Sequence, residues 1–269
     1  MRRRGRPMNM EGITDGNDGV APRYWTRDDG ARIAYHRRDG RSPTVVFLGG
    51  FSSDMTGTKA SHLDDWCRDR GQAYLRFDYQ GHGASSGRFI DGTIGTWRDD
   101  ALAVIEGCTE GPLMMVGSSM GAWIMLLVAR ALSRAIHGMV GLAAAPDFTE
   151  ELVWRRLPED ARELLASEGV IHVPSDYDVE GCPISHTLVS EGRDHLLLDT
   201  RIALDCPVRL LHGLDDRDVP WEMSRRLLQS LASTDATLEL VKGGDHRLSE
   251  PADLVRLSRA VGELLDARI

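Results

Sequence analysis

Short apolar runs alternate with helical patterns along most of this 269-residue chain, and this alternation restricts its fold more than any other feature. Strands and helices that alternate form a mostly parallel sheet with helices on both faces. We therefore predict an α/β fold whose chemistry lies at the carboxyl ends of the strands. The expected strands are residues 24–26, 33–36, 44–48, 73–77, 113–116, 138–142, 208–211 and 238–241. The expected helices are residues 59–70, 94–108, 120–132, 150–167, 222–231 and 253–267.

The alternation is interrupted between about residues 148 and 204, where a predicted helix is followed by an irregular stretch. We interpret this region as a small cap insertion within a body that extends over residues 23–269. Residues 1–22 begin with several arginines but lack the apolar segment of a secretory signal. They are predicted to form a disordered basic tail, and a targeting segment is the alternative.

Composition limits the partners and the compartment. Acidic residues outnumber basic ones by 41 to 32, which argues against nucleic-acid binding because clustered Lys and Arg are needed to neutralise phosphates. No run approaches 18 apolar residues, so no transmembrane helix is expected. The four cysteines are too far apart for a zinc site or a disulfide framework, and reduced thiols predict a cytoplasmic protein. They are Cys67, Cys108, Cys182 and Cys206.

The strongest chemical signal is the sequence Gly117-Ser118-Ser119-Met120-Gly121, which lies between an apolar strand and a helix. It matches the G-x-S-x-G nucleophile elbow in the strand–turn–helix context that this motif requires. We expect Ser119 on a tight turn that projects its hydroxyl above the sheet, with glycines on either side that let the turn close. The alternative is a Gly-Ser turn that merely caps the helix.

A serine nucleophile needs a base, and the base needs a group that orients it. In this type of fold, an acid and then a histidine follow the serine along the chain. His246 follows the last predicted strand in a glycine-rich loop, and Asp216 lies 30 residues earlier, after the strand at 208–211. We therefore predict Ser119, Asp216 and His246 as nucleophile, acid and base.

Neighbouring groups are alternatives to these choices. Asp215, Asp218 and Asp147 are other possible acids, and the aspartates near residue 216 are also compatible with a solvated turn or a weak cation site. The other histidines considered are expected to be structural: His212 at a strand end, His82 in a glycine-rich turn, and His62 and His137 on helix surfaces.

The oxyanion that forms during acyl transfer needs two backbone donors. Met120 begins the helix after the serine, so its N–H is the first candidate. The N–H of Phe51 is the second, because Gly49 and Gly50 precede it at a strand end and allow close approach to a substrate. An ordinary Gly-Gly strand terminator is the alternative. The glycine-rich turn at residues 81–87 lacks the spacing of a dinucleotide fingerprint, and no cofactor or metal is predicted.

These residues together resemble the α/β-hydrolase superfamily from about residue 24 to the C-terminus. The resemblance implies the α/β-hydrolase fold and the same roles for Ser119, Asp216 and His246. Within this superfamily, several stretches resemble the abhydrolase domain-containing protein 10 group more closely. This closer resemblance implies palmitoyl-protein thioesterase or acyl-glucuronide esterase activity. That group is mitochondrial, whereas we expect a cytoplasmic protein here. The stretches that carry the closer resemblance are 51–59 (FSSDMTGTK), 75–79 (LRFDY), 117–123 (GSSMGAW), 210–221 (LLHGLDDRDVPW) and 245–247 (DHR).

We therefore expect a serine hydrolase that cleaves carboxylic esters or acyl thioesters through an acyl-enzyme. Its expected substrate is a small molecule or an acylated protein, and the sequence does not specify an oligomeric state. A serine peptidase or a C–C bond hydrolase is the alternative on the same fold, and a non-catalytic binding protein is the alternative of a different class. The predicted helix at 150–167 is expected either to line an acyl pocket or to pack on the body.

Overall fold

The computed structural model describes residues 21–175 and 178–267, so residues 1–20 of the predicted tail lie outside the described residues. Within these ranges the chain forms an eight-stranded sheet and a two-stranded hairpin, and no helix has both the length and the apolar character that a bilayer crossing requires. The strands are β1 (Arg23–Thr26), β2 (Arg32–Arg38), β3 (Arg41–Leu48), β4 (Gln72–Phe77), β5 (Leu113–Ser118), β6 (Ile136–Leu142), β7 (Val170–Ser175), β8 (Asp178–Ser185), β9 (Val208–Gly213) and β10 (Ala236–Val241). The α-helices are α1 (Thr58–Arg70), α2 (Ile94–Cys108), α3 (Met120–Ala131), α4 (Glu159–Glu168), α5 (His186–Gly192), α6 (Glu222–Ser230) and α7 (Pro251–Asp266).

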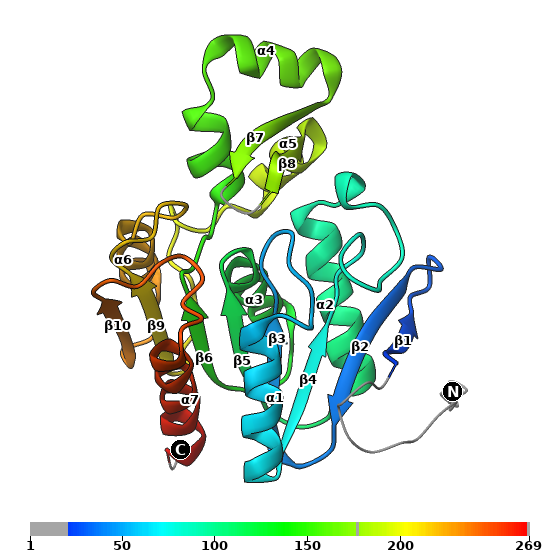
Figure 1. Cartoon of the computed structure of the whole chain (residues 1–269). Coiled ribbons are helices and arrows are strands. Elements are labelled where there is room, and N and C mark those ends of the chain that lie inside the picture. The colour runs from blue at the N-terminus through cyan, green and yellow to red at the C-terminus, as the bar shows by residue number, and fades with distance from the viewer. Residues whose placement is uncertain (1–20, 176–177, 268–269) are drawn as a thin grey trace.

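The eight strands of the large sheet lie in the order β1-β2-β4-β3-β5-β6-β9-β10. β2 is antiparallel to both of its neighbours, β1 and β4, and every later neighbouring pair is parallel. Figure 1 shows helices packed on both faces of this twisted sheet. The predicted α/β fold, with a mostly parallel sheet between two layers of helices, is confirmed.

Side-chain alternation explains why the central strands are unbroken apolar runs in the sequence. In β3, Val46 and Leu48 pack in a cluster with residues of α2 and α3, whereas Val45 and Phe47 pack in a second cluster with residues of α1 and α7. All four side chains are buried. A parallel strand that helices cover on both faces has no solvent side, so neither of its faces needs polar residues.

The chain between β6 and β9, which we call the insertion (residues 148–204), leaves the sheet and lies above the carboxyl ends of its strands (Figure 1). The prediction of one helix over residues 150–167 is wrong. Two short helical turns, η2 (Thr149–Val153) and η3 (Trp154–Arg156), come first, and α4 begins only after Pro158. Proline cannot continue a helix because it lacks an N–H and clashes with the preceding turn. The hairpin of β7 and β8 and the helix α5, which were not predicted, complete the insertion.

Asp147 joins the two ends of the insertion. Its carboxylate accepts hydrogen bonds from the N–H groups of Leu197 and Leu198, both at 2.8 Å, and the residue is 2 % exposed. Burial raises the pKa of Asp147 to about 6, because the two hydrogen bonds compensate only partly for the lost water. The insertion is therefore anchored by a buried carboxylate that titrates close to neutral pH.

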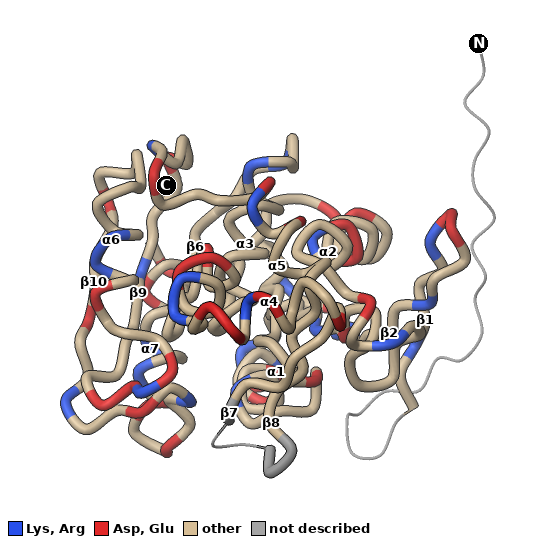
Figure 2. Tube along the Cα trace, turned by 90° about the horizontal axis from the view of Figure 1, so that it is seen from above, with Lys and Arg blue, Asp and Glu red and all other residues tan. Residues whose placement is uncertain are grey.

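Charges of both signs alternate over the face that is seen from above (Figure 2). Arg155 pairs with Glu150 at 3.3 Å and with Glu151 at 2.9 Å, and Arg193 pairs with Glu150 at 2.9 Å. Arg226, on α6 of the body, lies 3.2 Å from Glu151. Ion pairs of opposite sign thus connect the segments of the insertion to one another and to the body.

A buried ion pair lies between α1 and the antiparallel side of the sheet. Asp64 of α1 is 3.1 Å from the guanidinium of Arg76 on β4 and 2.8 Å from that of Arg38 on β2. The side chains of Asp64 and Arg76 are each 4 % exposed. Breaking such a pair from one side is costly, because the remaining charge stays buried without compensation.

We expect Asp64→Asn to lower the free energy of unfolding by about 3 kcal/mol, because it removes the negative charge between two guanidinium groups. Urea denaturation measures this difference. Asp39→Asn is the matched control, because Asp39 is 86 % exposed in its pair with Arg37 and its loss should not change stability measurably. Equal losses in the two variants would contradict the prediction.

The raised pKa of Asp147 predicts a pH-dependent stability. The ionised form is disfavoured in the fold, so its penalty is absent below the ordinary pKa of 3.8 and complete above about pH 6. The unfolding free energy of the wild type relative to Asp147→Asn should therefore fall by about 3 kcal/mol between about pH 4 and pH 7. Denaturation across this range measures the difference. The exposed Asp199→Asn is the control, and a flat difference for Asp147→Asn would refute the prediction.

Candidate active site

Ser119 occupies the turn between β5 and α3 with a φ of 54° and a ψ of −120°. A positive φ is strained for a residue that carries a Cβ. The surrounding backbone holds it in place: the Ser119 N–H donates to Leu142 at 2.9 Å, and its carbonyl accepts from Ala122 at 3.0 Å and Ala145 at 3.2 Å. This is the strained strand-to-helix turn that an elbow serine needs.

The two glycines of the elbow lie where no larger residue fits. A Cβ on Gly121 would be 2.1 Å from the carbonyl oxygen of Leu48 and 2.4 Å from that of Gly49. A Cβ on Gly117 would be 2.6 Å from the Cα of Ala122. These neighbours are backbone atoms that cannot rotate away. The absence of side chains therefore lets the loop after β3 pack directly against the elbow.

Ser119, Asp216 and His246 meet from three loops at the carboxyl ends of strands. His246 Nε2 lies 3.1 Å from Ser119 Oγ, and His246 Nδ1 lies 2.8 Å from Asp216 Oδ2. The Asp216 side chain is fully buried, whereas that of His246 is 16 % exposed. Because a carboxylate accepts from Nδ1–H, the unprotonated Nε2 faces the serine hydroxyl. The predicted base, His246, is therefore within hydrogen-bond distance of both the predicted nucleophile and the predicted acid.

Four donors surround the carboxylate of Asp216. Its Oδ1 accepts from the N–H groups of Asp218 at 2.9 Å and Val219 at 2.8 Å. Its Oδ2 accepts from His246 and also lies 3.1 Å from Nε2 of His212. Burial alone would raise the pKa of Asp216, but the hydrogen bonds from His212, His246 and Val219 outweigh burial and hold this pKa well below its ordinary value. Asp216 is therefore ionised at neutral pH.

The alternative acids have other positions. Asp147 anchors the insertion through Leu197 and Leu198. Asp215 is exposed, and Asp218 contributes its backbone N–H to Asp216. The geometry therefore favours Asp216 as the acid over Asp147, Asp215 and Asp218, the alternatives that the sequence left open.

His62, His82 and His137, the other histidines weighed in the sequence, have structural contacts. His82 Nδ1 donates to the carbonyl of Gln80 at 3.2 Å within its glycine-rich turn, as expected. His62 of α1 is 2.7 Å from the hydroxyl of Ser258. The placement of His137 on a helix is wrong, because β6 begins at Ile136 and the imidazole of His137 contacts the carbonyl of Leu264.

The loop between β3 and α1 carries the candidate oxyanion donor Phe51. A Cβ on Gly50 would lie 3.4 Å from the Cβ of Ser119, so this loop runs beside the elbow. Met55 in the same loop is held at both backbone groups: its N–H donates to Asp78 at 2.6 Å, and its carbonyl accepts from Arg76 at 2.7 Å. The sequence did not indicate that Arg76 and Asp78 fix this loop, because the contacts join residues more than 20 positions apart.

Lys59 connects the same region to the histidine loop. It is the second residue of α1, and its ammonium donates to the carbonyl of Arg247, next to His246, and lies 3.5 Å from the hydroxyl of Ser249. Burial lowers the pKa of Lys59 to about 8, although the carboxylate of Asp245 opposes this shift. Burying the ammonium of Lys59 costs desolvation free energy. The charge-assisted hydrogen bond that the protonated ammonium donates to the Arg247 carbonyl offsets part of this cost.

Aromatic rings surround Phe51 on the side of the insertion. Its ring centroid lies 4.8 Å from that of Phe89, 5.5 Å from that of Phe148 and 5.8 Å from that of Trp97. Phe148, where the insertion begins, is also 5.8 Å from Trp123 of α3. We call these five residues the aromatic cluster. Trp97, Trp123 and Phe148 are buried in the core, and only Phe51 and Phe89 are partly exposed beside the loop that carries the candidate oxyanion donor.

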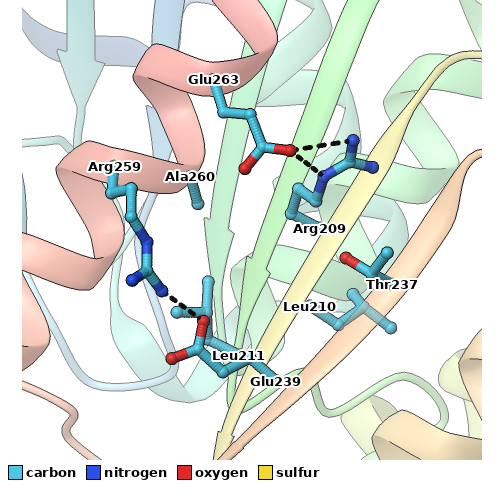
Figure 3. A pocket seen from close by; sticks show the side chains of 8 residues that line it. All are labelled: Arg209, Leu210, Leu211, Thr237, Glu239, Arg259, Ala260 and Glu263. Atoms are coloured by element: carbon cyan, nitrogen blue, oxygen red, sulfur yellow. Dashed lines mark hydrogen bonds and ion pairs between the residues drawn. The ribbon is translucent and has the colours of Figure 1, made fainter.

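Two hollows differ in their relation to the site. One of about 610 Å³ is lined by His246 and Asp216 and by the acidic residues Asp215, Asp218 and Asp245, together with Leu214 and Arg217. The other, of about 110 Å³, lies between β9, β10 and α7 (Figure 3). Its charged residues pair with one another, since Arg209 lies 3.3 Å from Glu263 and Arg259 lies 2.6 Å from Glu239. The first hollow therefore belongs to the candidate active site, and the second has the character of an ordinary ion-paired surface.

Asp216, Asp218 and His246 are the described group whose ligand atoms come close enough to hold a cation, within 4.8 Å of one another. Both nitrogens of His246 already face partners, Asp216 on one side and Ser119 on the other. A cation bound there would have to displace one of these contacts. The arrangement consequently suits proton transfer better than metal binding.

Comparisons with known proteins identify the fold and the family. A family model described as "Serine aminopeptidase, S33" matches residues 41–169. The bovine protein named "Palmitoyl-protein thioesterase ABHD10, mitochondrial" is 38 % identical over 244 residues, which cover 90 % of this chain and 79 % of the relative. The mouse α/β hydrolase domain-containing protein 10 matches with a TM-score of 0.86 and 35 % identity, over 92 % of this chain and 99 % of that chain. Est1E from Butyrivibrio proteoclasticus shares the fold, with a TM-score of 0.75 and 21 % identity over 90 % and 97 % of the two chains.

The relatives also correct one expectation. The bovine and human relatives are both named as mitochondrial proteins, so the prediction of a cytoplasmic protein is wrong. That prediction depended on the spacing of the cysteines, which indicates reduced thiols but gives no cellular address. The identity over nine-tenths of the chain and the matching fold lead to one conclusion: this chain is a hydrolase that belongs to the ABHD10 family of the α/β-hydrolases.

Proposed function

We propose that the protein is a serine hydrolase that cleaves acyl thioesters or carboxylic esters through a covalent acyl-enzyme. The observation that carries the proposal is the continuous line of hydrogen bonds from Ser119 through His246 to Asp216. A serine hydroxyl is a weak nucleophile by itself, and an adjacent base with an oriented ring is the arrangement that activates it. The strained backbone of Ser119 adds support, because such strain is concentrated at functional sites.

In the proposed mechanism, His246 Nε2 takes the proton of Ser119 Oγ as this oxygen attacks the acyl carbonyl. Asp216 holds the proton on Nδ1 and stabilises the imidazolium that forms. The tetrahedral intermediate collapses, its bond to the leaving alcohol or thiol breaks, and His246 returns the proton to that group. Water then attacks the acyl carbonyl of the acyl-enzyme while His246 accepts a proton from the water. His246 returns this proton to Ser119 Oγ as the bond between the serine and the acyl group breaks and the carboxylic acid is released.

The oxyanion of each tetrahedral intermediate would bind to the N–H groups of Met120 and Phe51. Met120 is the first residue of α3, so its N–H has no acceptor within the helix and carries the positive end of the helix dipole. Phe51 lies on the loop that Arg76 and Asp78 hold beside the elbow. Donors that are fixed before the reaction need no reorganisation as charge develops.

The relatives' names point to the substrate class. They are named palmitoyl-protein thioesterases, and we propose that this chain likewise removes fatty acyl groups from thioesters on proteins or small molecules. The partly exposed rings of Phe51 and Phe89, which the buried members of the aromatic cluster support, form the surface on which we place the acyl chain. On this proposal the leaving group faces the more polar hollow beside Asp216 and His246.

Replacing the nucleophile tests the proposal directly. We expect Ser119→Ala to reduce kcat for p-nitrophenyl esters by roughly 10⁴-fold or more, because no acyl-enzyme can form. A fluorophosphonate probe should label the wild type but not this variant. Ser118→Ala is the matched control, since it removes a neighbouring hydroxyl at the end of β5 and should retain labelling and turnover. Undiminished activity in Ser119→Ala would refute the mechanism, and labelling of neither wild type nor control would favour a non-catalytic binding protein.

Shortening an aromatic side chain tests the position of the acyl chain. We expect Phe89→Ala, which shortens one of the two partly exposed rings, to lower kcat/KM for a palmitoyl thioester about tenfold or more, because each lost apolar contact weakens binding of a long chain. An acetyl ester should change less than about threefold, since its chain does not reach the cluster. Steady-state kinetics on both substrates, with alkyl esters and acyl glucuronides for comparison, provide the measurement. Equal losses for long and short acyl groups would place the chain elsewhere.

A further inference from the structure

We propose that His212 is a positioning residue that fixes the carboxylate of Asp216 for the reaction, as a second imidazole on the oxygen that His246 uses. This inference rests on the proposed function of Ser119, Asp216 and His246. It goes beyond the sequence-based expectation that His212 only packs at a strand end.

His212 is fully buried at the end of β9, and each of its ring nitrogens has a defined neighbour. Nδ1 lies 2.7 Å from the hydroxyl of Ser224 on α6. Nε2 lies 2.9 Å from the carbonyl of Val219 and 3.1 Å from Oδ2 of Asp216. Ser224 is also fully buried, so the contacts are shielded from solvent.

These neighbours determine where the proton lies on the ring. Nε2 faces a carbonyl oxygen and a carboxylate, and both can only accept, so Nε2 carries the proton and donates. The hydroxyl of Ser224 can donate, so it supplies the hydrogen bond to the unprotonated Nδ1. The single N–H of Nε2 therefore donates to the Val219 carbonyl at 2.9 Å and lies 3.1 Å from Asp216 Oδ2, so Asp216 shares this donor without a positive charge on the ring.

The consequence for Asp216 is geometric. The N–H groups of Asp218 and Val219 hold Oδ1, and the two imidazoles His212 and His246 hold Oδ2. A carboxylate with donors on both oxygens cannot rotate without breaking a hydrogen bond. Without His212, Oδ2 would be held by His246 alone, and the carboxylate could pivot about Oδ1, which Asp218 and Val219 hold. Misplacement of about 1 Å at a reacting group can reduce a rate roughly a hundredfold.

The deciding variants remove or retain a donor at the position of Nε2. His212→Met fills similar space without a donor, and we expect kcat for p-nitrophenyl esters to fall between about tenfold and a hundredfold with KM changed less than about twofold. KM should be nearly constant because His212 lies behind Asp216 and away from the substrate. His212→Gln can place an amide N–H near the position of Nε2, and it should recover kcat to within about threefold of the wild type.

Ser224→Ala is the matched control. It removes the hydrogen bond on the far edge of the same ring and leaves the N–H toward Asp216 in place, so thermal stability should fall while kcat is retained. If His212→Met and Ser224→Ala lose stability alike and both keep full kcat, His212 is only a packing residue and the inference is overturned. Should His212→Met fail to fold, His212→Asn takes its place, because the shorter amide lies near the position of Nδ1 and leaves no donor at Nε2; a kcat loss no larger than that of Ser224→Ala would overturn the inference.

Proton NMR provides a readout that does not depend on turnover. The downfield resonance of the His246 N–H that is hydrogen-bonded to Asp216 should shift in His212→Met and stay in place in Ser224→Ala. No shift in either variant would contradict the inference. If the wild type shows this resonance but neither hydrolyses esters nor reacts with a fluorophosphonate, the proposed function fails while the contact between His212 and Asp216 is still tested.

Discussion

The backbone contact between the elbow and the loop after β3 is the constraint on which the rest of the site depends. Gly121 packs so closely on the carbonyls of Leu48 and Gly49 that no side chain fits between them. This contact joins the ends of β5 and β3, which lie side by side in the sheet. It sets the position of the Ser119 turn relative to Phe51. The loops that carry Asp216 and His246 then extend toward a position that the sheet has already fixed.

Two buried aspartates show how local donors decide the charge of a carboxylate. Asp147 and Asp216 both lose water, which raises the pKa of each. Asp147 has two backbone donors, and its pKa is raised to about 6. Asp216 has two backbone donors and two imidazoles, and its pKa is lowered. The additional side-chain donors therefore separate an anchor that titrates near neutral pH from a carboxylate that stays charged.

Local pattern was sufficient to predict the α/β fold, which is confirmed, because strand periodicity is a property of neighbouring residues. Motif spacing likewise led to the proposal of Ser119, Asp216 and His246, which the structure places in one continuous line of contacts. Local pattern was insufficient for the insertion, where Pro158 divides a segment whose apolar spacing looks like one helix. It also missed Lys59, which acts on a loop 188 residues away. Contacts of that kind depend on how elements pack, and a single sequence carries no direct signal for them.

The position of Lys59 has a consequence for thermal motion. α1 begins directly after the loop that contains Phe51, and Lys59 in its first turn holds the loop that contains His246. A helix moves as a rigid body, so a displacement of α1 carries both loops in the same direction. The distance between Phe51, the proposed oxyanion donor, and His246, the proposed base, should then fluctuate less than the position of either group.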